Sequence, residues 1–330
     1  MSLIFLGVDG GGTKTAFVLI DSEGRLLARH ESSTSYYLEI GFEALPALLT
    51  EGVQTVLAQA GLAADRIAHA FAGLPAYGED SALLARFNGV LDGLLPRERC
   101  TVGNDMICGW AGSLAGADGI SLVAGTGSIA YGEWGGRRAR CGGWGELFGD
   151  EGSAYWLARE GLSLFSHMAD GRTDPGPLLG LVRQQLQLAH DLDLCALMNG
   201  TGATQRSHMA QLARLVSMAA AQGDVQAHGL LARAGEALAA LALGTARQLG
   251  VPADAVLPVS YSGGVLKASA PVLAALRTTL AKVLPSAILI EPRFSPDIGA
   301  AIHAARLGGQ PFSAAAPMTL GTLGQRVATI

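Results

Sequence analysis

One order of elements occurs twice along the chain, and it limits the possible fold more than any other feature. In each copy an apolar strand runs into a glycine turn, and two further strands follow, separated by a second turn. The predicted strands are Leu3–Val8, Ala16–Ile20 and Arg25–His30 in the first copy, and Gly119–Ala124, Ile129–Trp134 and Arg137–Cys141 in the second. The residues of the copies are barely similar, so it is the order of elements that indicates a duplicated unit, one copy per domain.

After each set of three strands, helices alternate with further strands. The first copy continues with helix Phe42–Ala60, strand Ile67–Gly73, helix Leu83–Leu95 and strand Cys100–Gly103. The second continues with a mostly helical stretch, 153–250, that includes helix Gln226–Leu249, then strand Asp254–Tyr261, helix Val265–Leu284, strand Ala287–Glu291 and helix Asp297–Leu307. This alternation is typical of the α/β class. We expect an N-terminal domain over 1–115 and a C-terminal domain over 116–330, with the segment 297–330 able to pack back on the first domain.

Composition excludes several classes of protein. The 330 residues are 49% hydrophobic and 15% charged, which is enough to bury a core in each of two domains. The net charge of −5 and the lack of a Lys/Arg run argue against nucleic acid as a partner. The sequence shows no secretory signal and no apolar run of membrane-spanning length, so we expect no membrane contact. Four cysteines without a CxxC pair predict reduced, buried thiols in a cytoplasmic protein.

The first glycine turn carries groups that a plain hairpin does not need. The segment Gly7–Thr15 reads GVDGGGTKT. Glycines in a turn let backbone N–H groups approach a phosphate closely, and Thr13, Thr15 and Lys14 add hydroxyls and a cation. The order of residues is not that of a P-loop. A carboxylate inside a phosphate loop repels its ligand unless a cation lies between, so Asp9 indicates Mg²⁺; the alternative is a hairpin with Asp9 as turn former.

The second glycine turn is Gly125–Ser128. Alone it is compatible with a plain hairpin, and it indicates phosphate binding only in combination with the first turn. With Ala130 it matches the dinucleotide fingerprint GxGxxA, but that motif must open a helix, and Ile129–Trp134 is predicted as a strand. Two glycine hairpins, one per copy, favour a pair of loops that close on a triphosphate from opposite sides. The strand–helix turn Ser260–Val265 then becomes a candidate adenine platform, with Lys267 nearby.

Two more segments place acidic residues beside turns. Asp105 follows a strand and precedes a possible helix, so it is either a helix N-cap or a general base acting on a sugar hydroxyl, and spacing does not separate the two. The glycine-rich loop Gly142–Ser153 contains Trp144 and ends in Asp150 and Glu151. Its backbone and carboxylates suit the hydroxyls of a small polar ring, and a loop with acidic groups near a helix N-terminus is the alternative.

Together these motifs resemble the superfamily of sugar kinases, actin and heat-shock chaperone ATPases, in its BadF/BadG/BcrA/BcrD-type branch. The matching segments are Gly7–Thr15 and Gly119–Ser128 for the two phosphate motifs, Asn104–Asp105 and Asp297–Ala305 for the connecting motifs, and Ser262–Gly264 for the adenosine motif. They span nearly the whole chain. The resemblance implies a two-domain α/β fold of the actin/hexokinase type (ribonuclease H-like), with a duplicated βββαβαβα core and an interdomain cleft for ATP and sugar.

Within this branch, Cys141–Gly145 followed by Gly149–Trp156 is similar to the N-acetylglucosamine kinases. The resemblance implies that Asp105 is the catalytic base, and together with the residue patterns it predicts ATP and Mg²⁺ as cofactors, with Asp9 holding Mg²⁺ through water. The predicted nucleotide-binding residues are Gly10, Gly11, Gly12, Thr13, Lys14, Gly125, Thr126, Gly127, Ser128, Gly263, Gly264 and Lys267. The predicted sugar-binding residues are Asp105, Gly143, Trp144, Gly145, Asp150 and Ser35. Ser35 stands where the family has an asparagine, which leaves the identity of the amino sugar open.

The implied reaction is ATP-dependent phosphorylation of an amino sugar, N-acetylglucosamine to N-acetylglucosamine 6-phosphate, by a cytoplasmic enzyme that the family suggests is a homodimer. One alternative is a glucosamine kinase. Another is the ATPase activator of a 2-hydroxyacyl-CoA dehydratase or benzoyl-CoA reductase, although the spacing of Cys100 and Cys108 is not that of an iron–sulfur cluster. A sugar-sensing repressor would need a DNA-binding extension ahead of the first phosphate strand.

Overall fold

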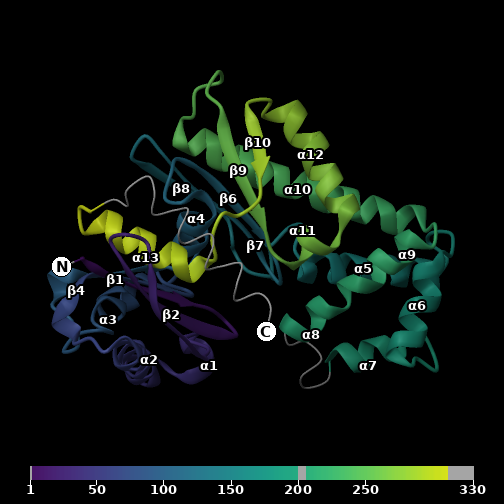
Figure 1. Ribbon diagram of the computed structural model, residues 1–330. Helices are drawn as coiled ribbons and strands as arrows, with labels where there is room; N and C mark the ends of the chain where they lie inside the picture. The colour runs from purple at the N-terminus through teal and green to yellow at the C-terminus, as the bar shows by residue number, and fades with distance from the viewer. Residues whose placement is uncertain (1, 200–205, 311–330) are drawn as a thin grey trace. The chain divides into compact units, whose positions relative to one another are not determined.

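The computed structural model describes residues 2–199 and 206–310 of the chain (Figure 1). These residues divide into two compact units. Unit 1 holds the described parts of Met1–Ala117 and Pro292–Ile330, and unit 2 is Asp118–Glu291. The chain therefore leaves unit 1, builds unit 2 and then returns. The domain ranges 1–115 and 116–330 stay a prediction, and residues 311–330 of the predicted C-terminal segment lie outside the described residues.

Unit 1 contains a mixed sheet with the strand order β3-β2-β1-β4-β5. The strands are β1 (Ile4–Gly10), β2 (Lys14–Asp21), β3 (Leu26–Ser33), β4 (Ile67–Leu74) and β5 (Cys100–Asn104). The first three pair antiparallel, whereas β4 lies parallel to β1 and β5 parallel to β4. The carboxyl ends of β1, β4 and β5 therefore meet at the same edge of the sheet.

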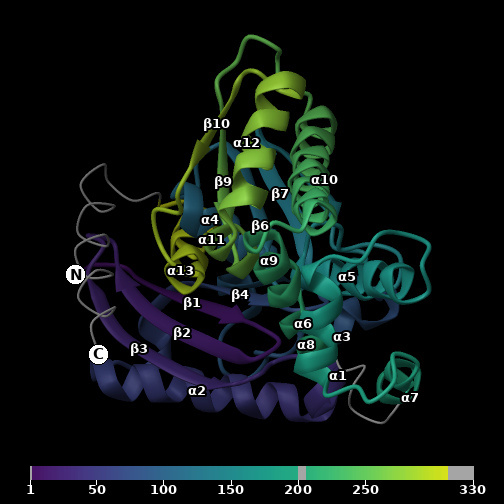
Figure 2. The same cartoon turned by 90° about the vertical axis from the view of Figure 1, so that its right-hand side faces the viewer.

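Helices cover both faces of this sheet. They are α1 (Tyr37–Ile40), α2 (Leu45–Ala60), α3 (Leu84–Asn88), α4 (Met106–Leu114) and α13 (Pro296–Leu307). Alternation along the strands sends Leu6 and Leu19 into one core with α2, and Phe5 and Val18 into another core with α13 (Figure 2). Strands that are buried on both faces read as continuous apolar runs, which is why β1 and β2 were visible in the sequence.

Glycines bring α13 close to α4 and β1. A methyl group added at Gly299 of α13 would collide with the Cys108 carbonyl oxygen and the Gly112 amide nitrogen, both in α4. One added at Gly7 of β1 would lie 2.7 Å from the Asp297 carbonyl oxygen. This packing fixes the N-terminal end of α13, and with it Asp297, beside the carboxyl end of β1.

Unit 2 repeats the topology of unit 1. Its sheet has the order β10-β9-β6-β7-β8. The strands are β6 (Gly119–Ala124), β7 (Ser128–Trp134), β8 (Arg137–Gly142), β9 (Leu257–Ser262) and β10 (Ala287–Ile290). Here too the first three strands pair antiparallel, and β9 and β10 run parallel to β6. In chain order, β6 to β10 therefore correspond to β1 to β5, which confirms the duplication.

Helices make up the rest of unit 2. They are α5 (Ala154–Ala169), α6 (Pro177–Leu186), α7 (Asp193–Asn199), α8 (Arg206–Gln211), α9 (Ala213–Ala221), α10 (Val225–Leu249), α11 (Gly264–Ala268) and α12 (Ala270–Val283). The side chain of Asp224 caps α10 by accepting from the amides of Gln226 and Ala227. Among the described residues, α10 is the helix long and apolar enough to cross a membrane, but 56% of its most apolar window is buried in the protein.

Two predicted helices differ from the structure because of glycine and proline. The helix expected over Leu83–Leu95 has only one short α-helical piece, α3, because Gly89 follows it and Gly93 adopts a left-handed φ of 86°. The helix expected over Val265–Leu284 breaks at Ser269, ahead of Pro271, whose nitrogen cannot donate a hydrogen bond.

All four cysteines are free thiols, but the expectation that they are buried is confirmed only for Cys108. Cys195 is exposed, and Cys100 and Cys141 are half-buried.

Candidate active site

Acidic residues of unit 1 gather at the carboxyl ends of its parallel strands. Asp9 lies near the end of β1 and pairs in register with Gly73 of β4, which in turn pairs with Gly103 of β5. Asp105 follows β5 directly, and its amide donates to the Leu74 carbonyl oxygen at the end of β4 (3.3 Å). The carboxyl edge of parallel strands is where α/β proteins place their ligands.

The structure bears on one of the two interpretations of Asp105, the helix cap. It occupies the N-cap position of α4, but its side chain makes no capping hydrogen bond. The preceding residue does this instead, because the Asn104 side-chain oxygen accepts from the Met106 amide (3.1 Å) while its amide group donates to the Tyr77 carbonyl (3.1 Å). Helix capping therefore does not account for a carboxylate at position 105, and the role of Asp105 as a general base stays a prediction.

Three carboxylates of unit 1 lie within electrostatic reach of one another. Burial raises the pKa of the Asp9 carboxyl well above its usual range, and the negative charges of Asp105 and Asp297 raise it further. The neighbouring Cys108 thiol and the Lys14 ammonium lower the Asp9 pKa in part. Without a cation this arrangement is electrostatically unfavourable, and a cation would relieve the repulsion.

The residues present fit Mg²⁺ better than a metal held by protein alone. Within 2–199 and 206–310, no three His, Cys, Asp or Glu side chains form a metal cage. Mg²⁺ usually keeps several waters and takes only one or two carboxylates together with substrate phosphates. Asp297 is 2% exposed, and its carboxylate lies 2.8 Å from the Arg29 guanidinium, which compensates its charge. The carboxylate of Asp9 is therefore less well compensated than that of Asp297.

The segment after β3 supports the first glycine turn. The Thr34 hydroxyl donates to the Gly11 carbonyl (2.9 Å). Ser35 is fully buried, a methyl group added at Gly10 would collide with its hydroxyl, and that hydroxyl has no partner among the described residues. In this conformation, Ser35 therefore packs under the turn, and a sugar could reach it only if the segment moved.

The polar side chains predicted for the first turn point to different environments. Lys14 is exposed, with its ammonium 2.6 Å from the Glu31 carboxylate, and Thr13 is exposed at the turn. The Thr15 hydroxyl is buried inside unit 1 and finds no partner among the described residues. In this conformation the Thr15 hydroxyl is thus covered by unit 1, and its contribution to the loop stays a prediction.

In unit 2, the second glycine turn connects β6 with β7, and the start of α5 supports it. The amides of Ala154 and Tyr155 donate to the carbonyls of Gly125 (2.9 Å) and Thr126 (3.2 Å). Ser128 is buried, and its hydroxyl donates to the Glu151 carbonyl (2.7 Å). Because a strand follows this turn, the dinucleotide fingerprint is excluded.

The predicted adenine platform lies next to this turn. Gly263 follows β9, which pairs with β6, and it has a left-handed φ of 96°. A methyl group there would collide with the backbone of Ala124, one residue before the second glycine turn. Gly264 begins α11, and Lys267 is exposed on it. The structure thus brings Gly125–Ser128 together with Gly263 and Gly264.

The glycine-rich loop after β8 splits into an exposed part and a buried part. Trp144 is 73% exposed, between Gly143 and Gly145, which both have left-handed φ. Asp150 is 1% exposed and accepts from the Ser128 amide (3.3 Å). In this conformation Asp150 therefore lies at the second glycine turn, and its predicted sugar contact stays a prediction.

Sequence reasoning missed two charged residues near these sites. Asp297 was placed in a motif but given no role, since an acidic residue in the first turn of a helix looks like an ordinary helix start. Arg206 was not singled out at all, yet it forms an ion pair with Asp150. Neither contact leaves a local signal in the sequence.

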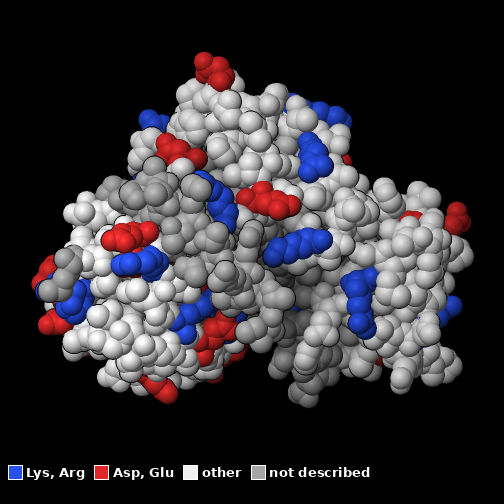
Figure 3. Space-filling view, viewed as in Figure 1, with Lys and Arg blue, Asp and Glu red and all other residues white. Residues whose placement is uncertain are grey.

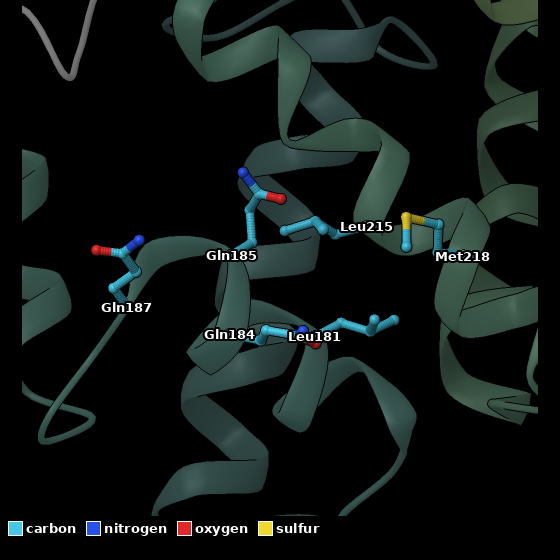
Figure 4. A pocket seen from close by; sticks show the side chains of 6 residues that line it. All are labelled: Leu181, Gln184, Gln185, Gln187, Leu215 and Met218. Carbon is cyan, nitrogen blue, oxygen red and sulfur yellow. The ribbon is translucent and has the colours of Figure 1, made fainter.

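Other surface features lie away from the predicted site residues. A hollow of about 380 Å³ in unit 2 is lined by Leu181, Gln184, Gln185, Gln187, Leu215 and Met218 (Figure 4). None of the predicted site residues lines it. On the face shown in Figure 3, Lys and Arg are scattered among Asp and Glu and form no basic stripe.

Comparison with known proteins identifies the family. The profile of the BadF/BadG/BcrA/BcrD ATPase family matches residues 6–304. The chain belongs to this family. The resemblance seen in the sequence is therefore confirmed.

Individual relatives within and beyond the family are similar over most of their length. The N-acetyl-D-glucosamine kinase of Dictyostelium discoideum is 29% identical over 314 residues, which cover 91% of this chain and 97% of the relative. The N-acetylmuramic acid/N-acetylglucosamine kinase of Clostridium acetobutylicum is 28% identical over 236 residues, which cover 71% of this chain and 76% of the relative. A provisionally named N-acetylglucosamine kinase structure from Chromobacterium violaceum superimposes with a TM-score of 0.69 at 28% identity, covering 92% of this chain and 99% of its own.

A glucokinase structure of the ROK family from Streptomyces griseus has a TM-score of 0.51 at 19% identity, covering 93% of this chain and all of its own. That level of similarity shows the fold alone, and it confirms the predicted fold class.

Proposed function

We propose that this BadF/BadG/BcrA/BcrD family protein is an ATP-dependent N-acetylglucosamine kinase that forms N-acetylglucosamine 6-phosphate and ADP. The observation that carries the proposal is Asp105, a carboxylate at the carboxyl edge of parallel strands that leaves the capping of its helix to Asn104. The relatives named for this reaction, similar over nearly the whole chain, support it.

In this mechanism Asp105 orients the 6-hydroxyl of the sugar and accepts its proton. The sugar oxygen forms a bond to the γ-phosphorus of ATP while the bond to the bridging β–γ oxygen breaks, so ADP leaves and the proton stays on Asp105 until solvent removes it. When bound, Mg²⁺ neutralises charge on the phosphates. Asp9 would hold it, through water.

Three glycines of the predicted nucleotide-binding set have no structural reason to be glycine. Gly12, Gly125 and Gly264 lie outside the left-handed region, and a methyl group added at any of them would meet no described atom within 4 Å. Their missing side chains leave open space, which a nucleotide approaching the backbone would need. This supports both glycine turns as phosphate contacts.

Gly125→Ala should therefore leave the melting temperature nearly unchanged while it weakens ATP binding by about tenfold or more, because the new methyl group occupies the approach to the backbone amides. Calorimetric titration with ATP and a thermal melt check this. As a control, the exposed Gly229 of α10 also has nothing within 4 Å; Gly229→Ala should gain about 0.5–1 kcal/mol of stability and keep its ATP affinity. Unchanged ATP affinity in Gly125→Ala would remove the turn from the nucleotide site.

An ADP-release assay over N-acetylglucosamine, glucosamine, N-acetylmannosamine and glucose tests the function itself. A pocket built to pair with an acetamido group rejects sugars that lack it, because its own polar groups are left unpaired. We expect a kcat/KM preference of about 10²-fold or more for N-acetylglucosamine over glucose and glucosamine. Equal or better turnover of glucosamine would replace the assignment by a glucosamine kinase.

Within that assay, Trp144→Ala should erode the preference by about tenfold and leave the KM for ATP nearly unchanged. Trp144 is 73% exposed, so its removal costs little packing. Phe148, 72% exposed in the same loop and outside the predicted contacts, provides the matched control. If Phe148→Ala erodes the preference as much as Trp144→Ala, the effect belongs to the loop as a whole.

The homodimer and the cytoplasmic location stay predictions, and light scattering tests the homodimer.

A further inference from the structure

An arginine outside every predicted motif lies on the second glycine turn. Arg206 begins α8, and a methyl group added at Gly127 would collide with its guanidinium and lie 2.8 Å from the Asp150 carboxylate. Gly127 is not in the left-handed region. The second glycine of the turn therefore lies against Arg206 and Asp150, and a side chain at this position would have to displace them.

Two carboxylates hold this guanidinium in place. It forms an ion pair with Asp150, which is buried and accepts from the Ser128 amide of the same turn. Its Nε lies 3.4 Å from the Glu146 carboxylate. With its side chain still 42% exposed, Arg206 is both fixed and able to meet a ligand. A guanidinium held by carboxylates is orientated before a ligand arrives, which lowers the entropic cost of binding.

A triphosphate carries several negative charges, and a cationic side chain at its binding site would stabilise them. The lysines in the predicted nucleotide set lie on other elements, Lys14 at the start of β2 in unit 1 and Lys267 on α11. The second turn otherwise offers backbone amides and the exposed Thr126 hydroxyl, which carry no full charge. Arginine is well suited to phosphate because its planar fork of N–H donors matches the phosphate oxygens.

We propose that Arg206 binds the β- or γ-phosphate of ATP at the Gly125–Ser128 turn, and that Asp150 positions it there. The proposal rests on the proposed function only in taking ATP as the ligand. It also gives Asp150 a task in nucleotide binding, independent of its predicted sugar contact.

The test compares nucleotides with and without the outer phosphates, in the absence of sugar. If Arg206 binds the β-phosphate, Arg206→Met should raise the dissociation constants of both ATP and ADP by about 10–100-fold. If it binds only the γ-phosphate, the dissociation constant of ATP alone should rise by this factor. In both cases the dissociation constant of AMP should change by less than about twofold. Arg206→Lys should recover part of the loss. Arg214→Met, at an exposed arginine of α9, is the matched control and should bind like the wild type.

Other outcomes decide against the proposal. If ATP and AMP weaken equally, or if only the melting temperature and the affinity for sugar fall, Arg206 is a structural partner of Asp150 and the proposal is overturned. Should Arg206→Met not fold, the ratio of ATP to AMP affinity in Arg206→Lys carries the same decision. A wild type that binds ATP but phosphorylates no amino sugar would remove the proposed function and leave this inference standing.

Discussion

Asp105→Asn should lower kcat by about 10²–10⁴-fold, the usual cost of losing a general base, while the fold and the affinity for sugar are retained. Asparagine keeps the size and hydrogen-bonding capacity of the side chain but cannot accept the proton of the 6-hydroxyl. Since Asp105 makes no capping bond, α4 loses nothing. Steady-state kinetics, sugar titration and a thermal melt measure the three quantities.

The neighbouring residue gives the opposite result and serves as the control. Asn104 is 7% exposed and bonds to both Met106 and Tyr77, so Asn104→Ala should lose stability, by about 1–3 kcal/mol, because a buried amide and carbonyl lose partners. A variant of Asp105 with near-normal turnover and a lowered melting temperature would mean that the residue supports the helix and that the base lies elsewhere.

Asp9→Asn should make the metal-free protein more stable and the enzyme about 10–100-fold slower. The native pKa of Asp9 lies above the unfolded value of about 3.9, so the native state binds more protons between these two values. Stability therefore falls as the pH rises through this window, because folding must either bury the Asp9 carboxylate beside other acidic groups or bind a proton to it. Neutral asparagine removes that repulsion, and each kcal/mol relieved raises the melting temperature by about 2–4 °C.

The measurement is a set of thermal melts from acid to neutral pH, in EDTA and with Mg²⁺ and ADP. Mg²⁺ should raise the melting temperature of the wild type more than that of Asp9→Asn. Asp254→Asn, the same change at an exposed residue, controls for the loss of one charge and should alter neither stability nor rate. If Asp9→Asn responds to Mg²⁺ as the wild type does, Asp9 is structural and the metal is held elsewhere.

The sequence was sufficient for features that a short segment determines. Strands β1 and β2 are apolar runs bounded by glycine, and the fold class follows from their repetition near residue 119. Asp105 was found because a carboxylate directly after a strand has few roles. Whether Asp105 caps its helix could not be read from the sequence, because that depends on side-chain geometry, and Asn104 takes the capping bond in the structure.

Tertiary contacts account for what the sequence did not reveal. Arg206 reaches Asp150 across 56 positions of the chain, through a helical stretch whose pattern reports only which face is buried. Ser35 was placed by resemblance on the sugar, whereas the structure packs it beneath Gly10. Contacts of this kind depend on how separate elements pack together, and the hydrophobic periodicity of the sequence does not predict them.

The return of α13 to unit 1 has a consequence for the order in which the protein matures on the ribosome. Phe5, Val18, Ile20 and Phe71 form a core with residues of α13, and a nascent chain that ends before residue 296 lacks the helix that supplies most of the rest of this core. Unit 2 is continuous from Asp118 to Glu291 and can close first. Strands β1 and β2 are therefore synthesised well before the helix that completes their core, and we expect unit 1 to finish its packing only after unit 2 has been synthesised.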